Sequence, residues 1–194
     1  MKLKSKYMER LPALVETLKK LKLIRPGVVL GGGALRGLFN KDEKIDDIDI
    51  FFTDLSQAPK LEKTLIKKGY KVVFKCPLGH LTTLKKDGEI KIQLITERQY
   101  VSPEEMIDTF DIEACRLAYD GKHIYVGSRQ TIRDIRRKQI NLWRIDYPNA
   151  TFKRVIKYTA KGYKATSEAV DKFTREIWRK GNLGQEMNTR FYVD

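Results

Sequence analysis

The chain has 194 residues, 41% of them hydrophobic and 10% aromatic, which suits one compact unit and excludes a chain that is disordered throughout. Lys and Arg number 39 against 25 Asp and Glu, giving a formal net charge of +14. This balance favours a polyanionic partner, with nucleic acid first and a merely solvated basic surface second. No stretch is long and apolar enough to span a membrane, so we expect no membrane partner.

The cellular setting is suggested by the N-terminus and by the cysteines. The first 24 residues are charged throughout and lack the apolar segment of a signal peptide. Cys76 and Cys115 lie far apart and have no CxxC neighbours, so neither a zinc site nor a disulfide framework is indicated. We therefore expect a reducing, intracellular and cytoplasmic setting.

The first hundred residues predict a sheet-rich lobe. Apolar residues at three- and four-residue steps predict a helix over 8–24, which the sequence Arg25-Pro26-Gly27 ends. The other elements expected in this lobe are a strand at 28–30, a short helix at 34–40, a strand at 47–52, a helix at 56–68, a strand at 70–75 and a hairpin at 80–96 around the turn Asp87-Gly88.

Beyond residue 100 the pattern becomes helical. Ser102 and Pro103 predict the capped start of a helix. The later elements expected are a short strand pair around Asp120-Gly121, helices within 128–143, 149–165 and 167–180, and a loose tail after Gly181. The composition therefore predicts a lobe at 1–100 and a mostly helical lobe at 101–194, which form one compact α/β (α+β) unit.

One motif carries the strongest chemical signal. Gly31, Gly32 and Gly33 follow an apolar strand, and Asp47 and Asp49 lie on one face of the next predicted strand. Two carboxylates about 6 to 7 Å apart along a strand repel each other unless a cation neutralises them, and Mg²⁺ is the usual one. The glycine turn lets backbone N–H groups approach phosphate oxygens. Either signal alone is weak, but their combination predicts a site for phosphate and Mg²⁺ (or Mn²⁺).

Several basic side chains are candidates for contact with phosphates. Arg36 follows the glycines and is expected to make a bidentate phosphate contact. Two helix faces are also basic, and each is either a contact surface for nucleotide or RNA or a solvated face. The first face carries Arg133, Arg136 and Arg137, and the second carries Arg154, Lys157 and Lys161.

Other polar and aromatic residues have simpler explanations. Tyr158 and Tyr163 are expected in the core rather than stacked on a base, because aromatic residues at helical spacing are mostly core residues. His80 and His123 lack partners at ligand spacing and are expected to be structural. Asp46 points to the opposite strand face from Asp47 and is expected to be a cap or the partner of an arginine.

On these residues the chain resembles the catalytic heads of poly(A) polymerases and tRNA CCA-adding enzymes, in the DNA polymerase β-like nucleotidyltransferase superfamily. The family pattern of a glycine pair, an arginine and Asp-x-Asp matches Gly32, Gly33, Arg36, Asp47 and Asp49. The stretches "FDIEACRLAYDG" at 110–121 and "FKRVIKYTAKGY" at 152–163 are similar to later family motifs. By this likeness the nucleotide-binding residues also include Asp111, Arg154 and Lys157. The layout is similar to short nucleotidyltransferase-like proteins, some of them in phages.

The chain also departs from the family pattern. Gly37 stands where the family has aspartate, and Asp111 is followed by Ile-Glu instead of Phe-Thr. The family's third metal carboxylate lies on a neighbouring strand, where this chain offers Gln93, so Glu89 is taken as the nearest acidic candidate for a catalytic role. The chain ends about where CCA-adding enzymes continue into their RNA-holding helical domains, so we expect the full tRNA grip to be absent.

The resemblance implies a nucleotidyltransferase fold, with a small mixed sheet flanked by helices and a helical second lobe. It also implies that an NTP, ATP or CTP, binds with Mg²⁺ between the glycine turn and the Asp47/Asp49 pair. The chain would transfer NMP to an acceptor hydroxyl at an RNA 3′ end, helped by Arg133, Arg136, Arg137 and Lys161, and would release pyrophosphate. Two alternatives remain open: AMP transfer to a protein or small molecule, and a degenerate, non-catalytic RNA-binding fold. A protein partner that holds the substrate is also compatible with so small a chain.

Overall fold

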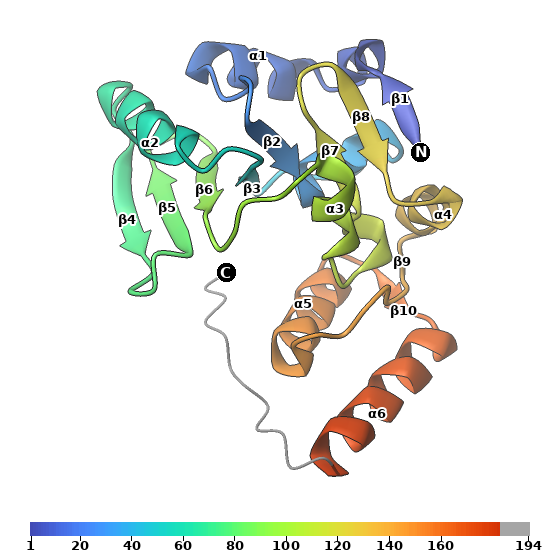
Figure 1. Ribbon diagram of the computed structural model, residues 1–194. Coiled ribbons are helices and arrows are strands. Elements are labelled where there is room, and N and C mark those ends of the chain that lie inside the picture. Colours follow the sequence, from blue (N-terminus) through green and yellow to red (C-terminus); the bar gives the residue numbers. More distant parts are fainter. Residues whose placement is uncertain (183–194) are drawn as a thin grey trace.

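A mixed sheet of eight strands forms the centre of the computed structural model, which describes residues 1–182 (Figure 1). The strands are β1 (Lys2–Lys4), β2 (Val28–Gly31), β3 (Asp47–Phe52), β4 (Lys71–Lys75), β5 (Leu81–Lys85), β6 (Lys91–Ile95), β7 (Leu117–Tyr119) and β8 (His123–Val126). Their order across the sheet is β1-β8-β7-β2-β3-β6-β5-β4. Strands β3 and β6 are parallel, and every other neighbouring pair in this sheet is antiparallel. The predicted mixed sheet is therefore confirmed.

Helices surround this sheet. They are α1 (Pro12–Leu21), α2 (Gln57–Lys67), α3 (Pro103–Asp108), α4 (Arg129–Arg137), α5 (Pro148–Ala160) and α6 (Ser167–Asn182), with 3₁₀ helices η1 (Ser5–Arg10), η2 (Gly32–Leu38) and η3 (Glu113–Cys115). Two short strands, β9 (Gln139–Ile140) and β10 (Lys164–Ala165), form a separate parallel pair. The helix predicted over 8–24 is shorter, because α1 begins at Pro12 and ends before Lys22, which takes the left-handed conformation.

The alternation of side chains along β3 separates the core from the pocket described below. Ile48, Ile50 and Phe52 are fully buried in one apolar cluster with side chains of α1 and α2. Burial of each contributes about 1.5–3 kcal/mol, and a slip of one residue would turn all three towards solvent and the aspartates into the core. The packing under α1 and α2 therefore fixes Asp47 and Asp49 on the opposite face of the sheet.

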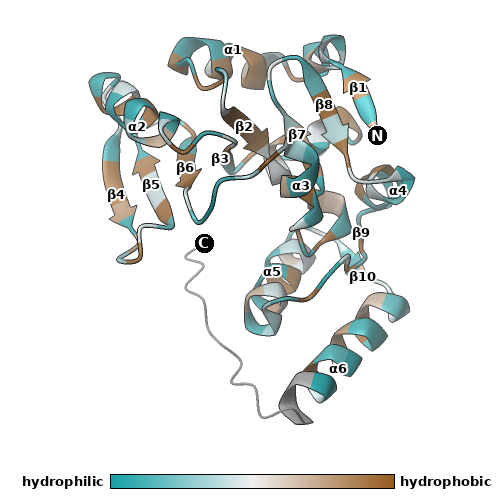
Figure 2. Ribbon diagram, viewed as in Figure 1, coloured by the Kyte–Doolittle hydropathy of each residue, from teal (hydrophilic) through white to brown (hydrophobic). Residues whose placement is uncertain are grey.

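The opposite face is covered only in part. A second, smaller cluster joins Phe51 and Tyr100 to Met106 and Ile107 of α3. Figure 2 shows brown, hydrophobic residues on the central strand β2 and teal, hydrophilic residues on α4 and β1. The part of this face beside α5 is left uncovered by α3, and the candidate site lies there.

The second half of the chain also contributes to the sheet. Strands β7 and β8 lie between β1 and β2, so the sheet continues past residue 100 into the segment expected to form the helical lobe. Their pairing confirms the strand pair predicted around Asp120-Gly121. The Ser102 cap is confirmed too, because its hydroxyl accepts a hydrogen bond from the backbone N–H of Glu105 at 3.2 Å. The predicted loose tail lies almost entirely outside the described residues. No helix within 1–182 has the length and apolar character needed to cross a membrane.

Candidate active site

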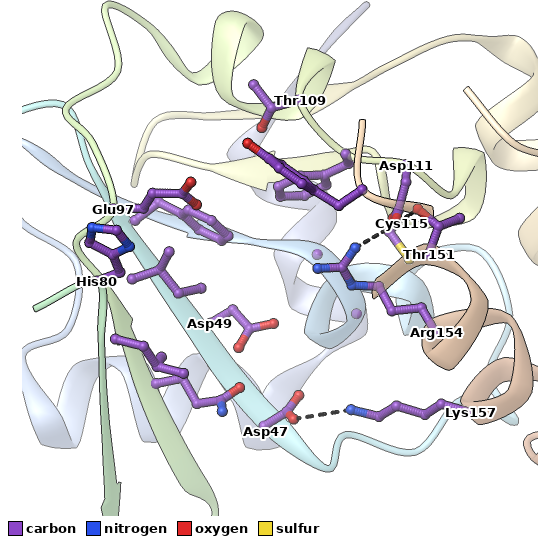
Figure 3. Close-up of a pocket in the computed structure, with 18 of the residues that line it drawn as sticks. Asp47, Asp49, His80, Glu97, Thr109, Asp111, Cys115, Thr151, Arg154 and Lys157 are labelled. Carbon is purple, nitrogen blue, oxygen red and sulfur yellow. Dashed lines mark hydrogen bonds and ion pairs between the residues drawn. The ribbon is translucent and has the colours of Figure 1, made fainter. Parts of the chain in front are cut away.

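A cavity of about 730 Å³ lies between the sheet and α5, within the size range of about 300–1,000 Å³ that is typical of small-molecule sites. Its walls come from the glycine turn at the start of η2, from β3 and β6, and from one side of α5. Figure 3 shows Asp47 and Asp49 projecting from β3 into this pocket, with Arg154 and Lys157 facing them from α5. The structure thus brings together most of the residues that the motif predicted.

The two aspartates of β3 have different surroundings. Asp47 lies opposite Lys91 of β6, and its Oδ2 is 3.3 Å from Lys91 Nζ and 3.8 Å from Lys157 Nζ. Asp49 is half-buried, and its Oδ1 is shielded from solvent without a hydrogen-bond partner within the described residues. Burial, followed by the charge of Asp47, raises the pKa of Asp49 to about 7.

The surroundings of Asp49 fit a divalent cation. A shielded carboxylate oxygen without a partner is unfavourable, and an added cation would compensate it. No group of three His, Cys, Asp or Glu side chains able to hold a metal exists within residues 1–182. Mg²⁺ does not need such a cage, because it commonly binds through one or two carboxylates and completes its shell with water and substrate phosphates. Asp47 and Asp49 therefore fit an open site that is shared with a phosphate ligand.

The glycine turn brings backbone close to Asp49. Gly32 has a φ of +72°, which favours glycine, and a Cβ placed there would lie 3.6 Å from Asp49 Oδ2. Gly31, which pairs with Asp49 across β2 and β3, has no space for a side chain, because its Cβ would lie 2.7 Å from the ring of Phe51. Two of the glycines are thus required by conformation and by close packing beside the carboxylates.

The structure places Arg36 in the lining of the pocket and gives it partners within the chain. Its side chain is 2% exposed, and its Nε donates to Glu43 Oε2 at 2.7 Å. Its NH1 donates to the hydroxyl of Tyr158 on α5, and Tyr163 donates to the other oxygen of Glu43 at 2.9 Å. Arg36 thus joins η2 to α5, and its bidentate contact with a phosphate stays a prediction. Tyr158 and Tyr163 are buried, as predicted.

The structure corrects the choice of Glu89 as a catalytic residue. Glu89 lies in the turn before β6 and accepts a hydrogen bond from Lys20 of α1 at 2.6 Å, so it is held on the α1 side, and it does not line the pocket. The residue paired with Asp49 across β3 and β6 is Gln93, which does line the pocket. The other departure, Gly37, has a steric reason, because a Cβ there would lie 2.7 Å from Leu11 Cδ2.

One side of α5 forms the wall that faces the aspartates. Asp111 accepts hydrogen bonds from Thr151 Oγ1 at 2.9 Å and from Arg154, so it orients Arg154 at the pocket. Lys161 forms an ion pair with Asp46, and its hydrogen bond lowers the pKa of that carboxyl. Asp46 therefore has a lysine partner where an arginine or a cap was expected. The pocket-lining residues of this wall are Tyr147, Thr151, Arg154, Lys157, Tyr158 and Lys161.

The three arginines of α4 are not part of this pocket. Arg133, Arg136 and Arg137 are exposed, none of them lines the cavity, and Arg133 donates to Gln130 of its own helix at 2.6 Å. Their proposed contact with RNA stays a prediction. Their helix covers η3 and β8, away from the aspartates.

Sequence reasoning missed the far end of the pocket. His80 and Glu97 line this end, opposite Lys157 in Figure 3, and His80 was expected to be only structural. A signal for Glu97 was present, because Gln93, Ile95 and Glu97 alternate along β6 and its extension and all three line the cavity. Arg98 and Arg144, also missed, come from irregular segments that carry no periodic pattern.

The arrangement of sheet, glycine turn and paired aspartates is that of a nucleotidyltransferase-like fold. A CCA-adding enzyme in complex with ATP matches with a TM-score of 0.66 and 16% identity, over 95% of this chain and 48% of that chain. A Thermotoga maritima CCA-adding enzyme complexed with tRNA matches with the same TM-score and identity, over 47% of its chain. At this level of identity the likeness shows the fold alone, and it confirms the predicted fold class.

A family assignment follows from the sequence itself. Residues 4–138 match the model of the Gabija anti-defense 2 family protein, and the chain belongs to this family. The protein named "Gabija anti-defense 2" of Bacillus phage SPbetaL7 is 28% identical over 152 residues, which are 77% of this chain and 36% of that relative. The chain thus spans about a third of the length of this curated relative and about half of the CCA-adding enzymes. The predicted likeness to phage-type nucleotidyltransferases is confirmed.

Proposed function

We propose that this chain transfers a nucleotidyl group from an NTP to an acceptor hydroxyl, with Mg²⁺ or Mn²⁺ held at Asp47 and Asp49. The observation that carries the proposal is the pair of carboxylates on β3, beside a glycine turn in a pocket of nucleotide size. One of the two has a shielded oxygen without a hydrogen-bond partner in the part of the chain that the structure describes. The fold shared with CCA-adding enzymes supports the same reaction class.

The residues of the chain have distinct roles in this proposal. Asp47 and Asp49 hold the divalent ion, which, when bound, supplies Lewis acidity towards the reacting phosphate. Gly32 lets the backbone approach the phosphates, and Lys157 and Arg154 stabilise their charge from α5. The chain contributes mainly position and charge, because phosphoryl-type transfer needs little general-base machinery.

The identities of the donor nucleotide and of the acceptor are part of the proposal. Structures of CCA-adding enzymes contain ATP, CTP and tRNA, which supports ATP or CTP as donor and RNA as acceptor. The net charge of +14 supports a nucleic-acid acceptor independently. A protein or small-molecule hydroxyl is the competing acceptor.

Label transfer tests the proposal. The protein is incubated with Mg²⁺ or Mn²⁺ and each α-labelled NTP, with RNA in one arm and extract protein in another, beside the Asp47→Asn/Asp49→Asn variant. Asp87→Asn is the matched control, because Asp87 is an exposed acid in the turn between β5 and β6. Transfer that the control retains and the double variant loses by at least about a thousandfold supports the proposal. Equal transfer by all three proteins would show that the activity does not depend on Asp47 and Asp49. Label found only on protein would show that the acceptor is a protein and not RNA.

A second candidate function is nucleotide or RNA binding without catalysis. The observation that favours it is Gln93, the residue paired with Asp49 where the superfamily pattern has a third carboxylate. In addition, Lys91 and Lys157 already neutralise Asp47 in part. Absence of transfer with every acceptor, from a folded protein that still binds NTP, would select this second function.

The family name suggests a biological role, which is opposition to a host defence called Gabija. We expect the Asp47/Asp49 site to be needed for that role. The test counts the plaques of a phage that Gabija restricts, on cells that carry Gabija. The cells express this chain, its Asp47→Asn/Asp49→Asn variant or the Asp87→Asn control. If the double variant still protects the phage, the anti-defence role does not depend on the Asp47/Asp49 site.

A further inference from the structure

A row of lysines crosses the sheet and ends at the carboxylate pair. Asp47 of β3 pairs with Lys91 of β6. The antiparallel register of β5 and β6 sets Lys85 opposite Lys91, and Lys85 pairs with Lys71 on the edge strand β4. Because paired positions of a sheet project to the same side, Lys91, Lys85 and Lys71 lie on the face that carries Asp47 and Asp49.

Two of these lysines lack an ion-pair partner among residues 1–182. Lys71 and Lys85 are exposed and form no ion pair among the described residues, whereas Lys91 contacts Asp47. Like charges on directly paired positions destabilise a sheet, since the Cβ atoms are only about 4.5–5.5 Å apart. The row is therefore an unfavourable arrangement for the protein alone and a favourable one for a bound polyanion.

The neighbouring lysines on the other face behave differently. Lys75 of β4 forms an ion pair with Glu62 of α2 at 3.5 Å, and Lys86 donates to the carbonyl of Lys68 at 3.0 Å. On the strands next to α2, Lys75 and Lys86 thus have partners among the described residues, whereas Lys71 and Lys85 on the face of the candidate site have none.

We propose that Lys71, Lys85 and Lys91 bind the phosphodiester backbone of a single-stranded nucleic acid. The row is one lysine wide on each strand and extends over three strands spaced about 4.8 Å apart, so it fits one extended chain of phosphates better than a duplex. It leads from the sheet edge to Asp47, which brings the terminal hydroxyl of the strand to the carboxylate pair. Lys157 of α5 remains on the other side of Asp47 for the triphosphate. The role of this strand as acceptor rests on the proposed function, whereas its binding to the row does not.

Binding of a short fluorescent single-stranded RNA tests the inference. It is measured in EDTA without NTP over a range of salt concentrations, so that catalysis plays no part. For Lys71→Gln/Lys85→Gln, affinity should fall several-fold, and the slope of log K against log salt should become shallower by roughly 1.4, at about 0.7 per lost phosphate contact on a single strand. Lys63→Gln/Lys67→Gln is the matched control, because it removes the same charge from exposed positions of α2 on the other face.

Each outcome has a defined meaning. Loss confined to the Lys71/Lys85 variant supports the inference, even if no label transfer is ever observed. Equal losses in both double variants would show that only net charge matters and would overturn it. Intact RNA binding, with weakened binding of NTP or of an acidic protein, would assign the row to that ligand and would also overturn it. Circular dichroism of each variant checks that the fold is retained.

Discussion

The Asp49→Asn substitution is expected to stabilise the metal-free protein at neutral pH. The asparagine keeps the shape of the side chain and removes a charge that burial and Asp47 oppose. The unfavourable effects of burial and of Asp47 are partly offset by the positive charges of Lys157, Lys91 and Arg154, which also face this carboxyl. The same substitution removes a proposed ligand of the divalent ion, so stability and function should change in opposite directions.

The size of the effect follows from the pKa of Asp49, which rises from 3.8 to about 7 in the folded protein. Because the folded state binds the proton more tightly than the unfolded state, the stability of the native protein falls as pH rises through this window. At about 1.36 kcal/mol for each pKa unit, the full cost above pH 7 is about 4 kcal/mol. The amide replaces the carboxylate imperfectly, so we expect the unfolding free energy of Asp49→Asn to exceed that of the native protein by about 2–4 kcal/mol at pH 8. This difference should decline to about zero at pH 4.

Urea unfolding at a series of pH values between about 4 and 8 measures this difference. Groups far from the site titrate equally in both proteins, so the difference in unfolding free energy reports Asp49 together with the charges that act on it, and Asp87→Asn controls for loss of an exposed acid. Added Mg²⁺ should stabilise the native protein at pH 8 more than the variant. A difference that is constant with pH, or a variant less stable than the native protein at pH 8, would refute this account of Asp49.

Three further predictions concern the surroundings of the site. Glu43→Gln leaves the buried guanidinium of Arg36 without its carboxylate and should lower the unfolding free energy in urea by about 3–5 kcal/mol, whereas a loss below about 1 kcal/mol would show the pair to be dispensable. Gly37→Asp should lower the melting temperature, because its Cβ would lie 2.7 Å from Leu11 Cδ2, and an unchanged value would contradict this packing. Burial raises the pKa of Asp134, so the stability of the native protein falls as pH rises through the titration of this carboxyl. Asp134→Asn should therefore be more stable than the native protein at pH 7 but not at acid pH. Urea unfolding at both pH values measures this, and an equal effect at the two would contradict the prediction.

The local sequence was sufficient to predict the strand that carries the aspartates. Alternation of Asp and Ile over 47–50, followed by Phe51 and Phe52, predicts both the bounds of β3 and the face to which Asp47 and Asp49 belong. The hairpin at Asp87-Gly88 likewise follows from turn chemistry and strand patterns on both sides. These features depend on residues that are close in sequence.

The features that sequence reasoning missed depend on distant contacts. Strand β1 has only three residues and is extended because it pairs with β8, more than a hundred residues later. Arg36 follows a glycine turn, as a phosphate-binding arginine would, but Tyr158 and Glu43 bury it. Glu89 is near Gln93 in sequence, yet its contact with Lys20 holds it on the other side of the sheet. No local pattern contains these partners.

Anomalous diffraction can locate the divalent ion that we propose at Asp47 and Asp49. Crystals of the protein grown with Mn²⁺ and a non-hydrolysable ATP analogue would locate the ion by its anomalous signal. We expect a peak about 2.0–2.3 Å from carboxylate oxygens of both Asp47 and Asp49, with the triphosphate beside Gly32. A bound nucleotide whose phosphates and ion lie away from this pair would contradict this expectation.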